Sequence, residues 1–253
     1  MIKQLKIKFE SDDSLKPNNS LASVFQGVLM EKIDTAYADE LHISRAHQYS
    51  QYIAGEDGCV VWNINALDDQ SADNIIKVLN SDTFDKAELK SKDITLNVVS
   101  KELDTLSYDD LLNEYYLDGK SARYITIRTI TPTAFKSNGK YVIFPSSKLI
   151  LNSIAKRYDA FSGSTSILDD QLSDYIEENT DIVEYDLRSV KFSLEGITIP
   201  SYIGTVKIKL SGNREFICLM NMLLRYGEYC GTGIKTSLGM GAYKIIHTGG
   251  MIK

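Results

Sequence analysis

The sequence is poor in the residues that build disulfide frameworks and metal sites. Its 253 residues include three cysteines, four prolines, three histidines and one tryptophan. Cys59, Cys218 and Cys230 are odd in number and far apart, which argues against a disulfide framework and against a Cys-x-x-Cys metal site. No apolar run approaches the length of a membrane span. We therefore expect a cytoplasmic protein with no metal, no cofactor and no membrane partner.

The charge of the chain is divided unevenly between its halves. Residues 1–118 carry 11 Lys and Arg against 22 Asp and Glu, whereas residues 119–253 carry 17 against 12. Nine of those 12 acids lie within residues 159–186. This asymmetry indicates a polyanion-binding surface in the second half. A basic surface that is merely solvated is the plainer alternative.

Hydrophobic periodicity predicts the order β-α-β-β-α-β in the first half. Leu5, Ile7 and Phe9 alternate with polar residues as in a half-buried strand. Helical spacing begins at Leu21, with Asn19 or Ser20 available as its N-cap. Two strand-like runs on either side of Gly55–Gly58 predict a hairpin, followed by a helix over 70–81 and a strand over 93–101. This order is the ferredoxin-like arrangement.

The second half repeats this order with insertions. A strand ends at Pro132, "SNG" predicts a turn, and a helix begins after Pro145. A polar insertion follows, then a strand pair over 190–200 and 203–210, an apolar helix over 214–229 and a last strand. We expect an α+β protein with two ferredoxin-like domains, residues 1–118 and 119–253, joined near Asp118 and Gly119.

The segment "YGEYCGTGIKTSLGMGAYKI", residues 226–245, holds five glycines. Glycine at this density is typical of backbone that bends sharply or approaches a ligand closely. The segment is not a P-loop, because Ile234 separates Gly233 from Lys235, and it lacks the third glycine of the dinucleotide fingerprint, where Thr236 stands. A phosphate-binding loop of another kind and a plain glycine-rich turn both stay open. A nucleotide-binding protein is disfavoured.

Two blocks of the chain resemble a known family. "GTGIKTSLGMGAYKI" is similar to the carboxyl-terminal glycine-rich signature of the RAMP superfamily, and "TPTAFKSNGKYVIFPSSKLILNSIAKRYDAF" resembles a block of its precursor-processing branch. The whole chain is similar to the endoribonucleases that cut precursor CRISPR RNA within its repeats, most of all to those that accompany type III-A systems. The resemblance implies two RRM-like ferredoxin folds, with RNA along a cleft and a basic face.

The resemblance makes precursor CRISPR RNA the expected partner. We expect the main-chain N–H groups of residues 231–239 to hold phosphates, with Lys235 as a point charge and Thr236 and Ser237 as hydroxyl donors. The predicted RNA-binding residues are Gly231, Gly233, Lys235, Thr236, Ser237, Gly239, Lys136 and Lys140. Weaker candidates are Arg123, Arg128, Arg157 and Arg225. Transient contact with a type III-A effector complex and a homodimer are compatible with the family.

RNA can be cut without a metal ion because its 2′-hydroxyl is a built-in nucleophile. Histidine titrates near neutrality and suits the proton transfers. The resemblance assigns His42, which follows Leu41 as in family members, as general base or acid; a plain surface histidine after the first helix is the alternative. His47 could make the second transfer or stack on a base. We expect His247 to be structural or solvent-facing.

The chain departs from the family pattern beside His42. Some members carry a tyrosine on the first helix and a lysine shortly after the histidine, but here Met30 and Gln48 take those positions. The remaining local candidates for the second proton or the positive charge are Lys32, Arg45, His47 and Tyr49. The other function that the sequence leaves open is a non-catalytic RAMP subunit that holds guide RNA.

Overall fold

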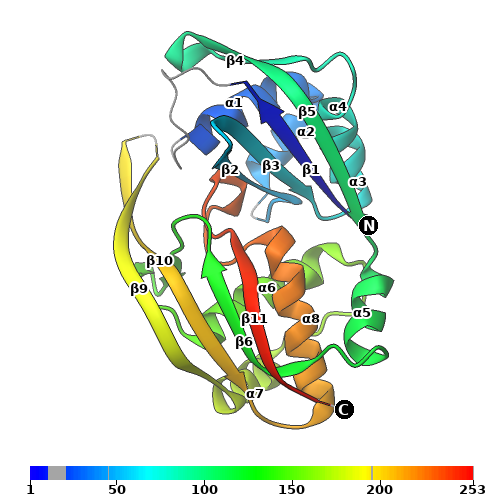
Figure 1. Ribbon diagram of the computed structural model, residues 1–253, viewed down its shortest axis with the longest axis vertical. Coiled ribbons are helices and arrows are strands. Elements are labelled where there is room, and N and C mark those ends of the chain that lie inside the picture. Colours follow the sequence, from blue (N-terminus) through cyan, green and yellow to red (C-terminus); the bar gives the residue numbers. More distant parts are fainter. Residues whose placement is uncertain (11–20, 45, 195, 253) are drawn as a thin grey trace. The chain divides into compact units, whose positions relative to one another are not determined.

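The computed structural model describes residues 1–10, 21–44, 46–194 and 196–252. The chain divides into two compact units, coloured along the sequence in Figure 1. Unit 1 consists of Met1–Leu106 and Thr236–Gly239, and unit 2 of Ser107–Lys235 and Met240–Lys253. The middle of the glycine-rich segment is therefore part of unit 1, although the residues on both sides of it belong to unit 2.

The division falls earlier in the chain than the expected junction at Asp118 and Gly119. The reason is helix α5 (Tyr108–Tyr116), which packs against helix α8 (Arg214–Cys230) of unit 2. Ser107 caps α5 in a reciprocal capping box with Asp110, a device that fixes a helix start.

Unit 1 is built on a five-stranded antiparallel sheet in the order β2-β3-β1-β5-β4. The strands are β1 (Ile2–Phe9), β2 (Tyr49–Glu56), β3 (Cys59–Ala66), β4 (Lys86–Leu89) and β5 (Ile94–Leu106). The helical segments are α1 (Leu21–Lys32), α2 (Thr35–Ile43), α3 (Asp69–Ser71), the π-helical η1 (Ala72–Ile76), α4 (Lys77–Leu79) and the 3-10 turn η2 (Lys90–Lys92). The order β2-β3-β1-β5 is that of a ferredoxin-like sheet, with β4 added at one edge.

The first half follows the predicted order and contains further elements, among them α2 and β4. Helix α2 was not expected; it forms because Asp34 accepts the N–H groups of Ala36 and Tyr37 at 2.9 and 3.2 Å and so caps a new helix directly after α1. Strand β4 was not expected either and lengthens the sheet beside β5. The predicted cap at Asn19 or Ser20 lies outside the described residues.

The core of unit 1 encloses a short polar relay. Phe25 and Trp62 pack with ring centroids 4.9 Å apart in this core. The Trp62 indole N–H donates to the amide oxygen of Gln51 at 2.6 Å, and the Gln51 amide nitrogen donates to the main-chain oxygen of Ser237 at 2.7 Å. These two hydrogen bonds attach residues 236–239 to the core. They also pair the polar atoms of the buried Gln51 side chain, which would destabilise unit 1 if they were left without partners.

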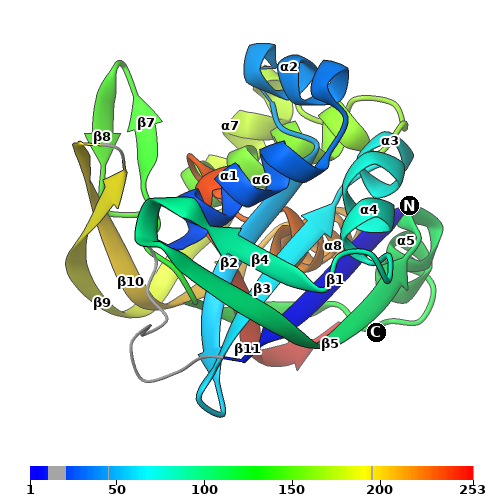
Figure 2. The same ribbon diagram turned by 90° about the horizontal axis from the view of Figure 1, so that it is seen from above.

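Unit 2 is built on a four-stranded antiparallel sheet in the order β11-β6-β10-β9, which is again the ferredoxin-like order. The strands are β6 (Ala122–Thr129), β9 (Thr180–Leu194), β10 (Ile197–Leu210) and β11 (Tyr243–Met251). Helices α6 (Ser147–Phe161) and α8 lie on one face of this sheet, and β7 (Phe135–Ser137) with β8 (Lys140–Val142) forms a separate hairpin (Figure 2). Helix α7 (Asp170–Asn179) completes the unit.

The predicted strand pair over 190–200 and 203–210 is wrong. Residues 197–210 form one strand, β10, which pairs along its whole length with the long strand β9. The prediction ended one strand at Pro200 and began the next at Ile203, whereas β10 continues through both positions. Strand β6 pairs only with Thr205–Lys209 of β10. Pro200 therefore lies where β10 has a single neighbour, a position at which a missing N–H is tolerated.

In the ranges given above, no helix is long and apolar enough to cross a membrane. Within those same ranges, no three His, Cys, Asp or Glu side chains are grouped so as to hold a metal ion.

Asn221 joins α8 to the first residue of β6, and its loss should destabilise unit 2. Its amide oxygen accepts the Ala122 N–H at 3.0 Å, and its amide nitrogen donates to the main-chain oxygens of Ala122 and Ile217. Asn221→Ala leaves buried main-chain groups unpaired, so we expect a loss of about 2–4 kcal/mol in the free energy of unfolding, measured by urea denaturation. Asn113→Ala, at an exposed helical position, is the control; equal losses would contradict this role.

Candidate functional site

His42 lies in the last turn of α2 and is exposed. It does not follow the first helix, as the sequence had suggested, because Asp34 starts a second helix that contains it. His47 lies in the segment between α2 and β2, half-buried, with its ring centroid 6.0 Å from that of Tyr49. Arg45, another local candidate, lies outside the described residues. The structure thus leaves His42 accessible to a substrate.

A chain of hydrogen bonds holds the region around His42. The Tyr37 hydroxyl donates to the Gln48 amide oxygen at 2.8 Å, and the Gln48 amide nitrogen donates to Gln70 at 2.9 Å. The Gln70 amide nitrogen donates in turn to the Glu40 carboxylate at 3.1 Å. Because Tyr37 and Glu40 belong to α2, the chain connects both the helix and the segment after it to α3.

This chain explains what Gln48 does in place of a lysine. A glutamine accepts from Tyr37 and donates to Gln70 at once, whereas a lysine can only donate. Burial, followed by the nearby carboxylates of Asp68 and Glu40, raises the pKa of Tyr37 well above its ordinary value. Tyr37 therefore stays protonated and acts as a hydrogen-bond donor. Gln48 and Tyr37 together fix geometry and supply no charge.

The other residues considered as a second catalytic group beside His42 differ in their exposure to solvent. Tyr49 is fully buried, and burial raises the pKa of its hydroxyl. Met30 is half-buried and packs against the core of unit 1. Lys32 is exposed at the end of α1. Within unit 1, His47 and Lys32 are thus the described candidates that remain for a second catalytic group.

The main-chain N–H groups at the start of the glycine-rich segment are used inside the protein. Those of Gly231 and Thr232 donate to the main-chain oxygens of Gly227 and Gly241, at 2.8 and 2.9 Å. Those of Gly233 and Ile234 donate to the Ser153 hydroxyl at 2.7 Å and to the Ala134 oxygen at 3.0 Å. The expectation that these four amides hold phosphates is therefore wrong.

Two glycines of this segment allow main chains to approach closely. A methyl group at Gly233 would lie 2.3 Å from the Ala134 oxygen, and one at Gly241 would lie 2.0 Å from the Thr232 oxygen. Both glycines also have a positive φ, 80° and 75°, a backbone conformation that residues with a side chain rarely adopt. The alternative interpretation as a tightly packed glycine-rich turn therefore accounts for them.

The other residues of this segment that were predicted to contact RNA differ in how exposed they are. Lys235 is exposed and has a φ of 57°, in the left-handed region. Thr236 and Ser237, which form the 3-10 turn η3 (Thr236–Leu238), are each 1% exposed. Gly239 is also buried. Lys235 thus stays a candidate phosphate contact, while Thr236 and Ser237 serve the packing of unit 1.

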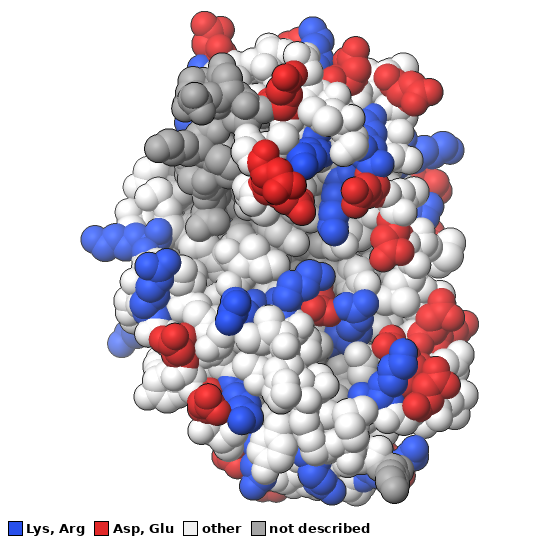
Figure 3. Space-filling view, viewed as in Figure 1, with Lys and Arg blue, Asp and Glu red and all other residues white. Residues whose placement is uncertain are grey.

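The sheet of unit 2 has a second face that α6 and α8 do not cover. Register places Arg128 opposite Thr205, Thr126 opposite Lys207, and Tyr124 opposite Lys209, and paired residues point to the same face. The Lys207 ammonium lies 5.9 Å from the Tyr124 ring centroid and 3.1 Å from Glu184. Figure 3 shows basic side chains over β6 and β10. The face combines cations with an aromatic ring, as RNA-binding sheets do.

Sequence reasoning had missed Tyr124, Lys207 and Lys209. The alternation in "TVKIKL" was a usable signal, because it places both lysines on the face opposite Val206 and Ile208. Strand β11 adds His247, which is exposed and stands opposite Thr126.

The other basic candidates have different environments. Arg225 is half-buried and paired with the buried carboxylate of Glu228, which gives it a structural role. Arg157 is half-buried on α6, whereas Arg123 is exposed at the start of β6. Lys136 and Lys140 are exposed on the β7–β8 hairpin. Both lysines are therefore accessible, and their contact with RNA stays a prediction.

Comparison with known proteins gives a consistent result. A family model for the CRISPR-associated endoribonuclease Cas6 matches residues 127–243. A Cas6 endoribonuclease of Streptococcus thermophilus is 32% identical over 250 residues, covering 96% of this chain and 98% of that protein. One from Mycobacterium tuberculosis is 28% identical over 227 residues, covering 89% and 72%. A solved Cas6 product complex aligns with a TM-score of 0.79 at 20% identity, covering 98% and 100%.

Removing Gln70 should loosen the end of α2. Gln70→Ala breaks both bonds that connect Gln48 and Glu40 to α3, so we expect faster amide hydrogen exchange over residues 41–48, measured by mass spectrometry. Global stability should fall by less than about 1 kcal/mol, because Gln70 is exposed. Asp73→Ala, exposed on the same helical segment, should leave the exchange unchanged. If exchange in Gln70→Ala matches the wild type, the chain does not hold this region.

Gly233→Ala should destabilise unit 2 through both a clash and backbone strain. We expect a loss of about 2–4 kcal/mol by urea denaturation. Gly119→Ala separates the two causes, since Gly119 has a φ of 68° but no neighbouring atom within 4 Å of an added methyl. It should lose only about 1–2 kcal/mol. Equal losses in the two variants would show that the Ala134 contact contributes nothing.

Proposed function

The chain belongs to the Cas6 family of CRISPR-associated endoribonucleases, and on that basis we propose that it cuts precursor CRISPR RNA within its repeats without a metal ion. The family relation extends over nearly the whole length of the chain. The exposed His42 in the last turn of α2 is the observation that carries the catalytic part of the proposal. The basic open face of the unit 2 sheet supports RNA binding.

The proposed reaction uses the RNA's own 2′-hydroxyl. The 2′-oxygen loses its proton and forms a bond to the adjacent phosphorus, while the bond from phosphorus to the 5′-oxygen breaks. The departing 5′-oxygen takes up a proton. The products are a 2′,3′-cyclic phosphate and a 5′-hydroxyl, and the overall step needs two proton transfers, of which His42 carries out one.

The second proton transfer has a weaker candidate. His47 follows His42 by five residues and is half-buried. Gln48, where some members carry a lysine, is neutral and bonded to Tyr37 and Gln70. Stabilisation of the charged phosphorane by a local lysine is therefore missing at this position. We expect a slower chemical step than in a site with all three groups.

Several finer assignments rest on the resemblance. We infer that the enzyme serves a type III-A system, makes transient contact with its effector complex and acts in the cytoplasm, where its RNA substrate is transcribed. A homodimer is compatible with the family.

Replacing His42 tests the catalytic assignment. His42→Ala should lower the single-turnover rate of repeat-RNA cleavage in EDTA by at least about 100-fold, with RNA affinity within about twofold of the wild type. Asp39→Ala, at another exposed position of α2, is the matched control and should cut normally. Undiminished cutting by His42→Ala would refute the assignment. Binding without cutting by the wild type would instead indicate a non-catalytic RNA-holding subunit.

A further inference from the structure

An exposed aromatic patch lies on unit 2, outside the sheet face described above. Phe144 and Tyr185 are 57% and 59% exposed, and their rings meet edge to face with centroids 5.4 Å apart. Tyr141, on the preceding strand β8, is 41% exposed. Exposed aromatic side chains gathered in this way mark interaction sites more often than scattered surface residues do.

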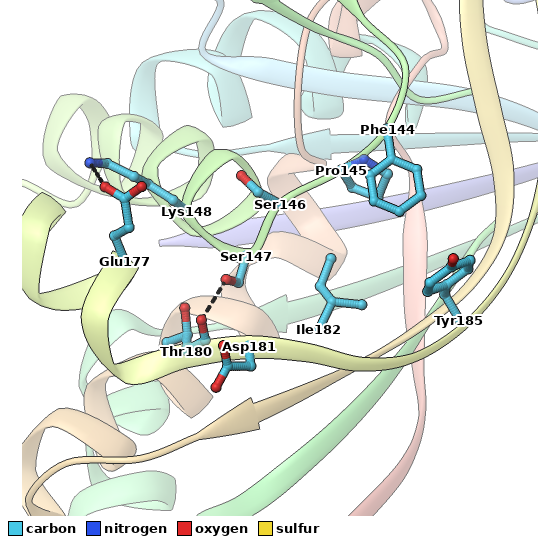
Figure 4. Close-up of a pocket in the computed structure, with 10 residues that line it drawn as sticks. All are labelled: Phe144, Pro145, Ser146, Ser147, Lys148, Glu177, Thr180, Asp181, Ile182 and Tyr185. Atoms are coloured by element: carbon cyan, nitrogen blue, oxygen red, sulfur yellow. Dashed lines mark hydrogen bonds and ion pairs between the residues drawn. The ribbon is translucent and has the colours of Figure 1, made fainter.

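The aromatic pair forms one end of a pocket. The pocket has a volume of about 300 Å³ and lies between the residues that lead into α6 and the first part of β9. Ile182 and Pro145 line it beside the two rings, and the ion pair of Lys148 with Glu177 lies at the other end (Figure 4). Its size is at the lower limit of small-molecule sites, about 300–1,000 Å³, which suits one planar ring system.

The charges around the pocket favour an anionic partner at its aromatic end. Lys136 and Lys140 are exposed on the neighbouring hairpin, and the Lys136 ammonium lies 5.9 Å from the Tyr141 ring centroid. No ion pair of either lysine is found among the described residues. Both cations are therefore available to phosphates.

The acidic groups nearby are compensated or point elsewhere. Asp174 and Glu177 both bind the Lys148 ammonium, at 3.3 and 2.5 Å. Glu184 binds Lys207 on the sheet. The Asp181 carboxylate points away from Phe144 and Tyr185 (Figure 4). A basic peptide would meet Lys136 and Lys140, so nucleic acid is the better occupant.

We propose that the Phe144–Tyr185 pair binds an unpaired base of the RNA, with one ring stacked on the face of the base and the other against its edge. Lys136 and Lys140 contact the adjacent phosphates. The inference rests on the proposed function in taking RNA as the ligand. Stacking on aromatic rings tolerates any base, because every base has a π-face. The pocket therefore adds affinity for single-stranded RNA without a sequence requirement of its own.

The first experiment measures binding of fluorescein-labelled dodecaadenylate, an RNA whose bases are unpaired, by fluorescence anisotropy. The double variant Phe144→Ala/Tyr185→Ala should bind at least about fivefold more weakly than the wild type. Phe144→Tyr, which keeps a ring, should bind within about twofold. Leu117→Ala removes another exposed apolar side chain of unit 2, 76% exposed, and should also bind normally. Thermal unfolding of each variant checks that the fold is kept.

A salt titration separates the lysines from the rings. Lys136→Ala/Lys140→Ala should lower the slope of log K against log salt by roughly 0.7 for each lost phosphate contact. The aromatic double variant should leave that slope unchanged.

The results also distinguish this inference from the proposed function. Equal binding of dodecaadenylate by the wild type and the aromatic double variant overturns the stacking site, and so does a wild type that does not bind this RNA; a protein partner would then be the better occupant of the patch. If the wild type cuts repeat RNA in either case, the proposed function still stands. If ring-dependent binding is found without cleavage, the stacking site stands and the nuclease assignment fails.

Discussion

The path of the glycine-rich segment depends on two positions where the main chain is too crowded to admit any side chain. Gly233 and Gly241 lie so close to the carbonyls of Ala134 and Thr232 that a methyl group at either would overlap an oxygen atom. Between these glycines the chain leaves unit 2, contributes residues 236–239 to unit 1 and returns. The Gln51 side chain attaches residues 236–239 to unit 1 by donating a hydrogen bond to the main-chain oxygen of Ser237. The glycine signature thus encodes a connection between packed elements, with Lys235 as its exposed residue.

The two ferredoxin-like folds could be predicted because apolar residues alternate with polar ones along the strands and recur at helical spacing along the main helices. Helix α2 could not, since its start depends on Asp34 accepting two N–H groups and not on a strong apolar pattern. The prediction divided β10 after Pro200. Whether a strand continues through a proline depends on whether a second strand needs its N–H, and that pairing is set only in the folded sheet. The prediction that the glycine-rich amides hold phosphates was wrong for residues 231–234 because the acceptors of these amides could not be foreseen. Two of them, the Ala134 oxygen and the Ser153 hydroxyl, are distant in sequence.

The catalytic candidate came from the resemblance, and its surroundings came from the structure. Sequence placed His42 after a leucine but could not show that Tyr37, Gln48, Gln70 and Glu40 form one hydrogen-bonded chain beside it. In these hydrogen bonds Gln48 is a neutral support that carries no charge. If His42 is the catalytic group, as proposed, its placement contributes more than local positive charge at Gln48.

The chemical identity of the RNA ends tests the central claim most directly. A repeat-containing RNA is incubated with the wild-type protein in EDTA, and the product ends are identified by mass spectrometry. Attack by the 2′-hydroxyl predicts a 2′,3′-cyclic phosphate on the upstream product and a 5′-hydroxyl on the downstream one. A 3′-hydroxyl with a 5′-phosphate would show that water is the nucleophile and would contradict the account.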